Sequence, residues 1–115
     1  QERLAGLRPL LRLIAAREAL VAERAELGEI RKDGARLGSR DPRARLRRQR
    51  ELAMEQRVRR LPKVTEALRR RLAAWAAEHR GEPFRAADGR PLAAALEEEE
   101  ARWAAALEAR KRDKK

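Results

Sequence analysis

Apolar residues recur at intervals of three and four along most of the 115-residue chain, which is the spacing of amphipathic helices. Two such stripes run side by side before residue 33. Their members are Leu4, Leu7, Leu11, Ile14 and Val21 in one stripe and Leu10, Leu13, Leu20 and Leu27 in the other. They predict a first helix over about residues 2–32, which Pro9 either begins or kinks because proline lacks a backbone donor. Arg31 and Lys32 in the last turn, followed by Gly34, are helix stop signals.

A longer stripe predicts a middle helix over about residues 42–80, with a bend near Pro62. The stripe consists of Met54, Val58, Leu61, Val64, Leu68, Leu72, Trp75 and His79. Residues 33–40 read as a loop, after which Asp41 is expected to cap the helix and Pro42 to begin it. The stretch before Met54 carries few large apolar residues, so it is expected to project along or beyond the other helices.

A second loop, with a turn at Asp88-Gly89, precedes a third helix predicted over about residues 91–113. The apolar stripe of this helix is Leu92, Leu96, Trp103 and Leu107. Three amphipathic helices joined by short loops predict an all-α fold, an antiparallel three-helix bundle occupying residues 1–115 as one domain. Because the chain begins with Gln1 rather than Met, we expect it to be a segment of a longer protein.

The positive charge of the chain is concentrated in the middle helix. The net charge is +11, and residues 40–63 hold 10 basic and 3 acidic residues, or +7, whereas residues 1–39 and 64–115 carry +2 each. A patch of like charges repels itself unless an anionic partner offsets it. Nucleic acid, an anionic membrane and an acidic protein surface are the partners to consider. Arginine outnumbers lysine 25 to 5, which suits carboxylate or phosphate recognition, although a GC-rich genome also enriches arginine.

Sequence motifs of catalysis are scarce, and we expect neither an enzyme nor a cofactor or metal site. The chain has no cysteine, one histidine and no glycine-rich phosphate loop. His79 continues the apolar stripe and is expected to pack or cap, and Trp75 and Trp103 are expected to pack. Consecutive carboxylates at 97–100 point in different directions on a helix, so we expect a solvated face that pairs with arginines such as Arg69, Arg70 and Arg71.

The sharpest functional candidate is the arginine-rich part of the middle helix. Its candidate binding residues are Arg43, Arg45, Arg47, Arg48, Arg50 and Arg57. A solvated charged helix is the plain interpretation, and a docking surface for a polyanion is the alternative. One exposed ion pair contributes only about 0.2–1 kcal/mol, so binding needs several together and weakens with salt.

Several segments in order resemble a known family. They are Leu61–Val64, Ala74–His79 with its Trp and Glu-His, Phe84, Asp88–Leu92 and, upstream, Asp41-Pro42. Together they resemble the spectrin-type microtubule-binding domain of the antiparallel microtubule bundlers, which are the protein regulator of cytokinesis in animals and the sixty-five-kilodalton microtubule-associated proteins of plants. The chain departs from the family in lacking its glycine-rich loop after Asp-Pro, so Arg43 or Arg45 would take the place of one arginine used there.

The resemblance implies a spectrin-like bundle that docks its basic helix on the acidic tubulin lattice. It implies a microtubule-associated location, at a spindle midzone, cortical array or axoneme, and homodimerisation through a rod outside this segment. The alternative is a basic helical nucleic-acid-binding protein, for example one associated with ribosomes. Few aromatic residues are available to stack on single-stranded bases, and too few large apolar residues oppose the arginines for a membrane-surface helix.

Overall fold

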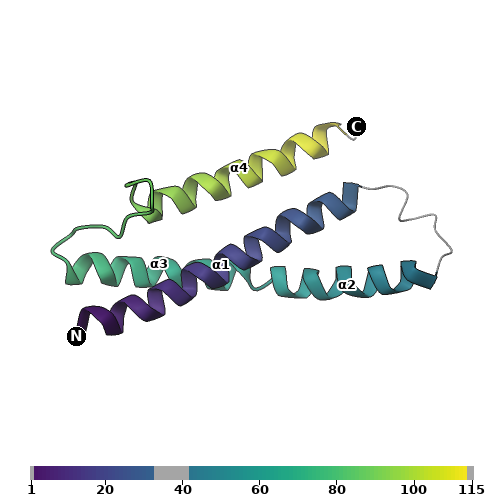
Figure 1. The fold of residues 1–115 in the computed structure, drawn as a ribbon. Coiled ribbons are helices and arrows are strands. Elements are labelled where there is room, and N and C mark those ends of the chain that lie inside the picture. Colours follow the sequence, from purple (N-terminus) through teal and green to yellow (C-terminus); the bar gives the residue numbers. More distant parts are fainter. Residues whose placement is uncertain (1, 33–41, 114–115) are drawn as a thin grey trace. The chain divides into compact units, whose positions relative to one another are not determined.

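The computed structural model describes residues 2–32 and 42–113, but only the backbone of residues 2–5 and of Lys32. Four helices account for most of this part of the chain (Figure 1): α1 (Glu2–Lys32), α2 (Pro42–Val58), α3 (Leu61–Glu78) and α4 (Leu92–Asp113). Over the same residues there is no strand, only an isolated bridge between Arg85 and Pro91. The predicted all-α class is confirmed. The predicted loop, Gly34 stop signal and Asp41 cap lie outside the described residues.

Two compact units divide the chain, Gln1–Leu68 and Arg69–Lys115, and the boundary falls inside α3. In the first unit, cross-helix pairs fix the direction of the helices. Arg31 near the end of α1 pairs with Glu51 of α2, at 3.5 Å from Nε to Oε1. Glu23 pairs further along with Arg57, at 2.9 Å. Because the partner number rises as the α1 number falls, α1 and α2 are antiparallel, as Figure 1 shows.

The core of the first unit joins α1 to residues from the predicted middle stripe and to Ala44, which the stripe did not include. Its buried apolar residues are Leu10, Leu27, Ala44, Met54, Leu61 and Leu68. Leu10 and Leu68 are the largest fully buried side chains of the described chain. Leu11, which the spacing also places on an apolar stripe, is instead 48% exposed. The two predicted α1 stripes together cover a wider arc than one neighbouring helix can bury, which explains this error.

A buried polar contact lies within this core. Arg17 is 2% exposed and Thr65 is 4% exposed, and the Arg17 Nε–H donates to the Thr65 hydroxyl oxygen at 3.2 Å. This contact joins α1 to the first turns of α3 and extends the antiparallel register seen between α1 and α2. A buried guanidinium is tolerated only when hydrogen bonds replace the water it loses, so this pair is a fixed part of the core.

The predicted middle helix is divided, not merely bent. Regular helix ends at Val58, Arg59 and Arg60 form a turn, and α3 begins at Leu61. The Arg60 N–H donates to the Arg57 carbonyl oxygen at 3.0 Å, which tightens the last turn. Pro62 explains the break, because its ring clashes with the carbonyl four residues earlier and it has no N–H to donate. Proline is tolerated in the first turn of a helix, so α3 starts beside it.

The second unit holds the end of α3, a loop and α4. Leu72 and Leu96 are buried, and Arg69 of α3 pairs with Glu97 of α4 at 2.6 Å. The helix α3 ends at Glu78, where the Gly81 N–H donates to the Ala76 carbonyl oxygen at 2.7 Å. This bond closes a helix C-terminus through residues of positive φ, Arg80 at 57° and Gly81 at 89°. Leu107 was expected in the apolar stripe of α4 but is 38% exposed.

Candidate functional site

Five of the six candidate arginines lie together in the first half of α2. We call this group the α2 arginine cluster: Arg43, Arg45, Arg47, Arg48 and Arg50. Every member is exposed, and the first turn of α2 contains no acidic residue. The N-terminus of a helix carries partial positive charge, so cations there are unfavourable by roughly 0.3–1 kcal/mol each. Arg43 and Arg45 in the first turn therefore oppose the helix dipole, and an anion bound there would be favourable.

The carboxylates of α2 face away from this cluster. Glu51 and Glu55 turn toward α1, where both pair with Arg31. Glu55 also pairs with Arg59 in the next turn, at 3.4 Å. Within the described part of the chain, Arg45, Arg47, Arg48 and Arg50 make no hydrogen bond or ion pair with another described residue. The carboxylates of α2 thus pair with Arg31 at the seam with α1, and the positive charges of Arg45, Arg47, Arg48 and Arg50 are not offset by a described carboxylate.

The sixth candidate, Arg57, is separated from the cluster. It lies seven residues beyond Arg50, or about 10 Å along the helix. Its Nε–H donates to both carboxylate oxygens of Glu23 in α1, at 2.9 and 3.0 Å. The structure therefore brings Arg57 to the α1–α2 seam, where it links the two helices. Sequence spacing alone grouped it with the cluster because it falls on the same side of the helix as Arg43, Arg47 and Arg50.

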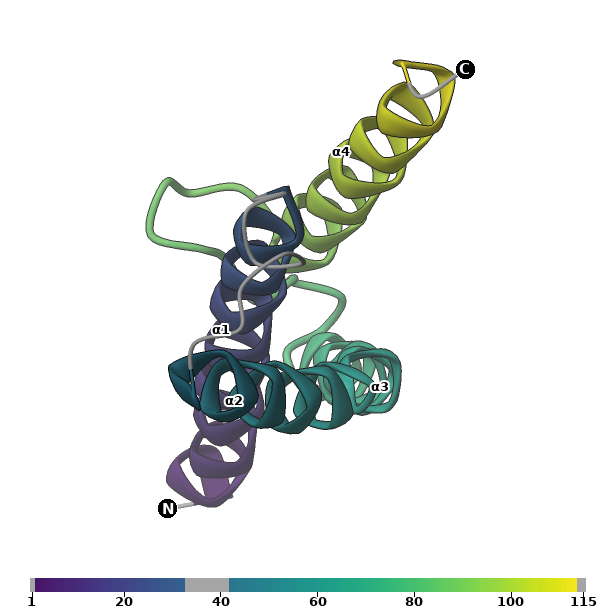
Figure 2. The ribbon, with the colours of Figure 1, turned by 90° about the vertical axis from the view of Figure 1, so that its right-hand side faces the viewer.

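The cluster also lies beyond the paired part of α1. The last described turn of α1 contains Arg31, whose partners begin at Glu51. Residues 42–50 of α2 precede Glu51, so α2 continues for nine residues, or about 13 Å, beyond its first ion pair with α1. Figure 1 shows the dark teal end of α2 reaching past the blue end of α1, and Figure 2 looks along α2 from that end. The expectation that this stretch projects beyond its neighbour agrees with this register.

Three of the residues that carry the family resemblance, Trp75, His79 and Phe84, form a packed corner in the second unit. The Trp75 and His79 rings stack at 4.0 Å with an interplanar angle of 17°. Phe84 meets Trp75 edge-on, with centroids 5.4 Å apart. His79 Nδ1 lies 2.7 Å from the Trp75 carbonyl oxygen, and because a carbonyl can only accept, Nδ1 carries the proton. His79 therefore packs and caps the end of α3, as expected.

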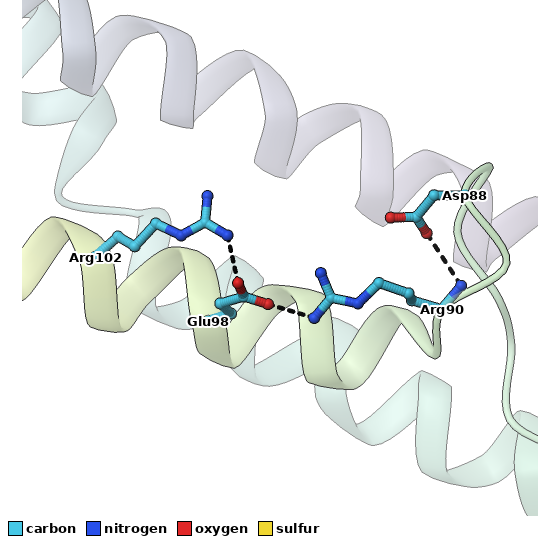
Figure 3. A network of polar contacts seen from close by, with 4 residues as sticks. All are labelled: Asp88, Arg90, Glu98 and Arg102. Atoms are coloured by element: carbon cyan, nitrogen blue, oxygen red, sulfur yellow. Dashed lines mark hydrogen bonds and ion pairs between the residues drawn. The ribbon is translucent and has the colours of Figure 1, made fainter.

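The turn after Phe84 is held by a polar network (Figure 3). The Asp88 carboxylate accepts from the Arg90 backbone N–H at 3.0 Å. The guanidinium of Arg90 and that of Arg102 both donate to Glu98. The hydrogen bond from Arg90, followed by that from Arg102, lowers the pKa of Glu98, and the same bond raises the pKa of Arg90. The Glu97–Glu100 run thus supplies partners for arginines, including Arg69 as expected.

Two features of the first unit were not predicted from the sequence. The first is the buried Arg17, although it follows Leu10 by seven residues and so occupies a position of the apolar repeat. A charged residue at such a position was the available signal. The second is the exposure of Leu46 and Leu52 on α2, at 57% and 59%. They are the only large apolar residues of α2 before Met54. That they lie on neighbouring parts of the helix surface becomes clear only from the helix geometry.

Other site types find no support over the described residues. No group of three or more histidine, aspartate or glutamate side chains could hold a metal ion there. Within the same ranges, no helix combines the length and apolar character needed to cross a bilayer. Comparisons with protein-family models, curated proteins and solved structures gave no match.

Proposed function

We propose that the chain is the microtubule-lattice-binding module of a bundling or axonemal structural protein. The α2 arginine cluster docks on the acidic outer surface of tubulin. The observation that carries the proposal is this cluster, exposed at the positive end of a helix while the carboxylates of the same helix turn toward α1. Several arginines that cost stability in the isolated chain gain it back when carboxylates approach them.

The resemblance of the corner in the second unit supports this proposal independently. The Trp, Glu-His, Phe and Asp-Gly of the resembled pattern occur here as Trp75, Glu78-His79, Phe84 and Asp88-Gly89. His79 and Phe84 both pack on the ring of Trp75, and this packing supports the resemblance. By the same resemblance, we propose that a rod outside this segment supplies dimerisation and hence cross-linking of filaments.

Cosedimentation with microtubules tests the proposal. The variant Arg45→Gln/Arg48→Gln/Arg50→Gln removes three charges from the cluster. We expect it to bind about 10–100-fold more weakly, because each lost pair contributes on the order of 0.5–1 kcal/mol at the surface. We also expect the binding of the wild-type chain to fall steeply between low and physiological salt.

The matched control is Arg8→Gln/Arg12→Gln/Arg71→Gln, which removes the same charge from exposed arginines outside α2. It should retain most of the binding. Equal losses in the two variants would mean that the net charge alone drives binding and would reject the assigned surface. Nanomolar binding to RNA at physiological salt, with none to microtubules, would instead establish the nucleic-acid alternative.

A further inference from the structure

The most exposed large apolar side chains of the described residues lie inside the arginine-rich half of α2. Leu46 and Leu52 are 57% and 59% exposed, more than Leu11 or Leu107. Exposed leucines are common singly. These two are connected by helix geometry, because residues three apart form a ridge inclined to the helix axis. Leu46, Gln49 and Leu52 form such a ridge, which we call the leucine ridge.

The middle of the leucine ridge faces away from α1. At about 100° per residue, Gln49 lies about 140° around the helix from both Ala44 and Met54, the buried residues of α2. Leu46 lies about 80° from Met54 and Leu52 about 80° from Ala44, so the two leucines flank the buried side of α2 and remain more than half exposed. Its two leucines remain in water in the isolated chain, and burying them elsewhere is favourable.

Arginines border the ridge on both sides. Arg45 and Arg48 precede Gln49 and Leu52 by four residues, and Arg50 follows Leu46 by four. None of the three pairs with another described residue. The surface is thus two leucines, about 120° apart around the helix and separated by Gln49, with arginines on both outer sides. Its complement is a groove lined by apolar side chains and bordered by carboxylates, which is the surface of an acidic amphipathic helix.

We infer that the leucine ridge and its bordering arginines dock an acidic amphipathic helix on the surface of a folded protein. Identifying that helix as part of tubulin rests on the proposed function. A phosphate backbone or a flexible acidic tail satisfies the arginines but leaves both leucines in water. A lipid surface needs a broader apolar face than two leucines separated by a glutamine. A second copy would bring its own arginine rows against these.

Fluorescence anisotropy with two synthetic helical peptides tests this inference without tubulin. Both peptides carry the same glutamates, and one has a leucine stripe where the other has serines. We expect the wild-type chain to bind the leucine peptide about tenfold more tightly, the gain from covering two half-exposed leucines. Leu46→Ser/Leu52→Ser should abolish this preference, and Leu11→Ser, an exposed leucine on α1, should retain it. Equal affinity of the wild-type chain for both peptides would overturn the inference.

A parallel arm uses microtubules whose flexible acidic tails have been removed by proteolysis. We expect Leu46→Ser/Leu52→Ser to bind them about tenfold more weakly with an unchanged salt dependence, because no charge is lost. A chain that prefers the leucine peptide but ignores microtubules retains the inference and loses the proposed function. A chain that binds microtubules with no effect of the double substitution, and with no peptide preference, retains the function and loses the inference. Circular dichroism of each variant confirms that its helices are intact.

Discussion

Arginines are paired with glutamates in one region of this molecule and have no described polar contact in another. In the second unit, Arg69, Arg90 and Arg102 each meet a glutamate of α4. In the first half of α2, Arg45 and Arg48 meet no other described side chain through a polar contact. The side chains are chemically identical, and the difference is whether carboxylates lie within reach.

The difference teaches that a charge count per segment is less informative than the direction in which the carboxylates face. Segment α2 does contain Glu51 and Glu55, but both turn to the seam with α1. A helix that placed them one residue later would bring them toward the arginine rows and neutralise these. The arginines that meet α4 glutamates help hold the second unit together, whereas Arg45, Arg47, Arg48 and Arg50 of α2 meet no carboxylate of the described residues.

The buried arginine Arg17 is a third environment, and breaking its contact should change the free energy of unfolding more than any other substitution considered. Arg17 is buried and donates to Thr65. Thr65→Val keeps the shape but removes the acceptor, so we expect the free energy of unfolding to fall by about 1.5–3 kcal/mol, the cost of weakening a buried bond to a charged group. Chemical denaturation measures it. Thr65→Ser, which keeps the hydroxyl, should lose clearly less, and an equal loss would show that the hydrogen bond contributes little.

Arg57 allows the comparison to be tested within α2 itself. Its ion pair with Glu23 is partly exposed, with side-chain exposures of 47% and 27%. Arg57→Gln should therefore lower the unfolding free energy by only about 0.2–1 kcal/mol. The loss should shrink in about 1 M salt, where exposed charges are screened. If the loss is the same at both salt concentrations, the contact acts through packing and not through charge.

Substituting Arg45, Arg48 and Arg50 should not lower the stability of the chain, in contrast to substituting Arg57. Removing positive charge with Arg45→Gln/Arg48→Gln/Arg50→Gln relieves repulsion among the like charges of the cluster. We expect the melting temperature to stay the same or rise, corresponding to a change within about 0.5 kcal/mol. A clear fall in thermal unfolding would mean that these arginines stabilise the fold, and the contrast with Arg57 would disappear.

Glu98 gives the smallest expected effect and a pH signature. Its folded pKa is lowered by Arg90 and then Arg102, so its stabilisation is complete above its ordinary pKa of about 4.3 and is lost as pH falls through the lowered value. The wild-type chain should melt slightly higher than Glu98→Gln near pH 7. This difference should close under acid conditions. A difference that stays constant down to pH 2 would show that the carboxylate charge is not its cause.

Much of the helical fold could be predicted from the sequence because its apolar residues follow helical spacing so regularly. Met54, Leu61, Leu68 and Leu72 are buried as the stripe predicts. The division at Arg59 and Arg60 could not be predicted with the same ease, because a proline can either bend a helix or begin a new one. Which of these happens depends on contacts beyond the local sequence.

The candidate site was predictable only as a region. Composition places the arginines in the middle segment, but periodicity cannot show which of them a distant helix neutralises. Glu23 precedes Arg57 by 34 residues, so their contact depends on the tertiary register of α1 against α2. For the same reason, Leu46 and Leu52 acquire meaning only when the buried side of α2 is known.

The antiparallel register of the first unit has a consequence for how the chain folds. Its three cross-helix contacts span increasing stretches of sequence, from Arg31–Glu51 through Glu23–Arg57, 34 residues apart, to Arg17–Thr65, 48 residues apart. Each contact closes a loop that the previous one has already shortened. Forming them in this order therefore costs little entropy per step. Folding of this unit should thus zip from the Arg31 end toward Leu10, and lengthening the segment between α1 and α2 should slow folding more than it lowers stability.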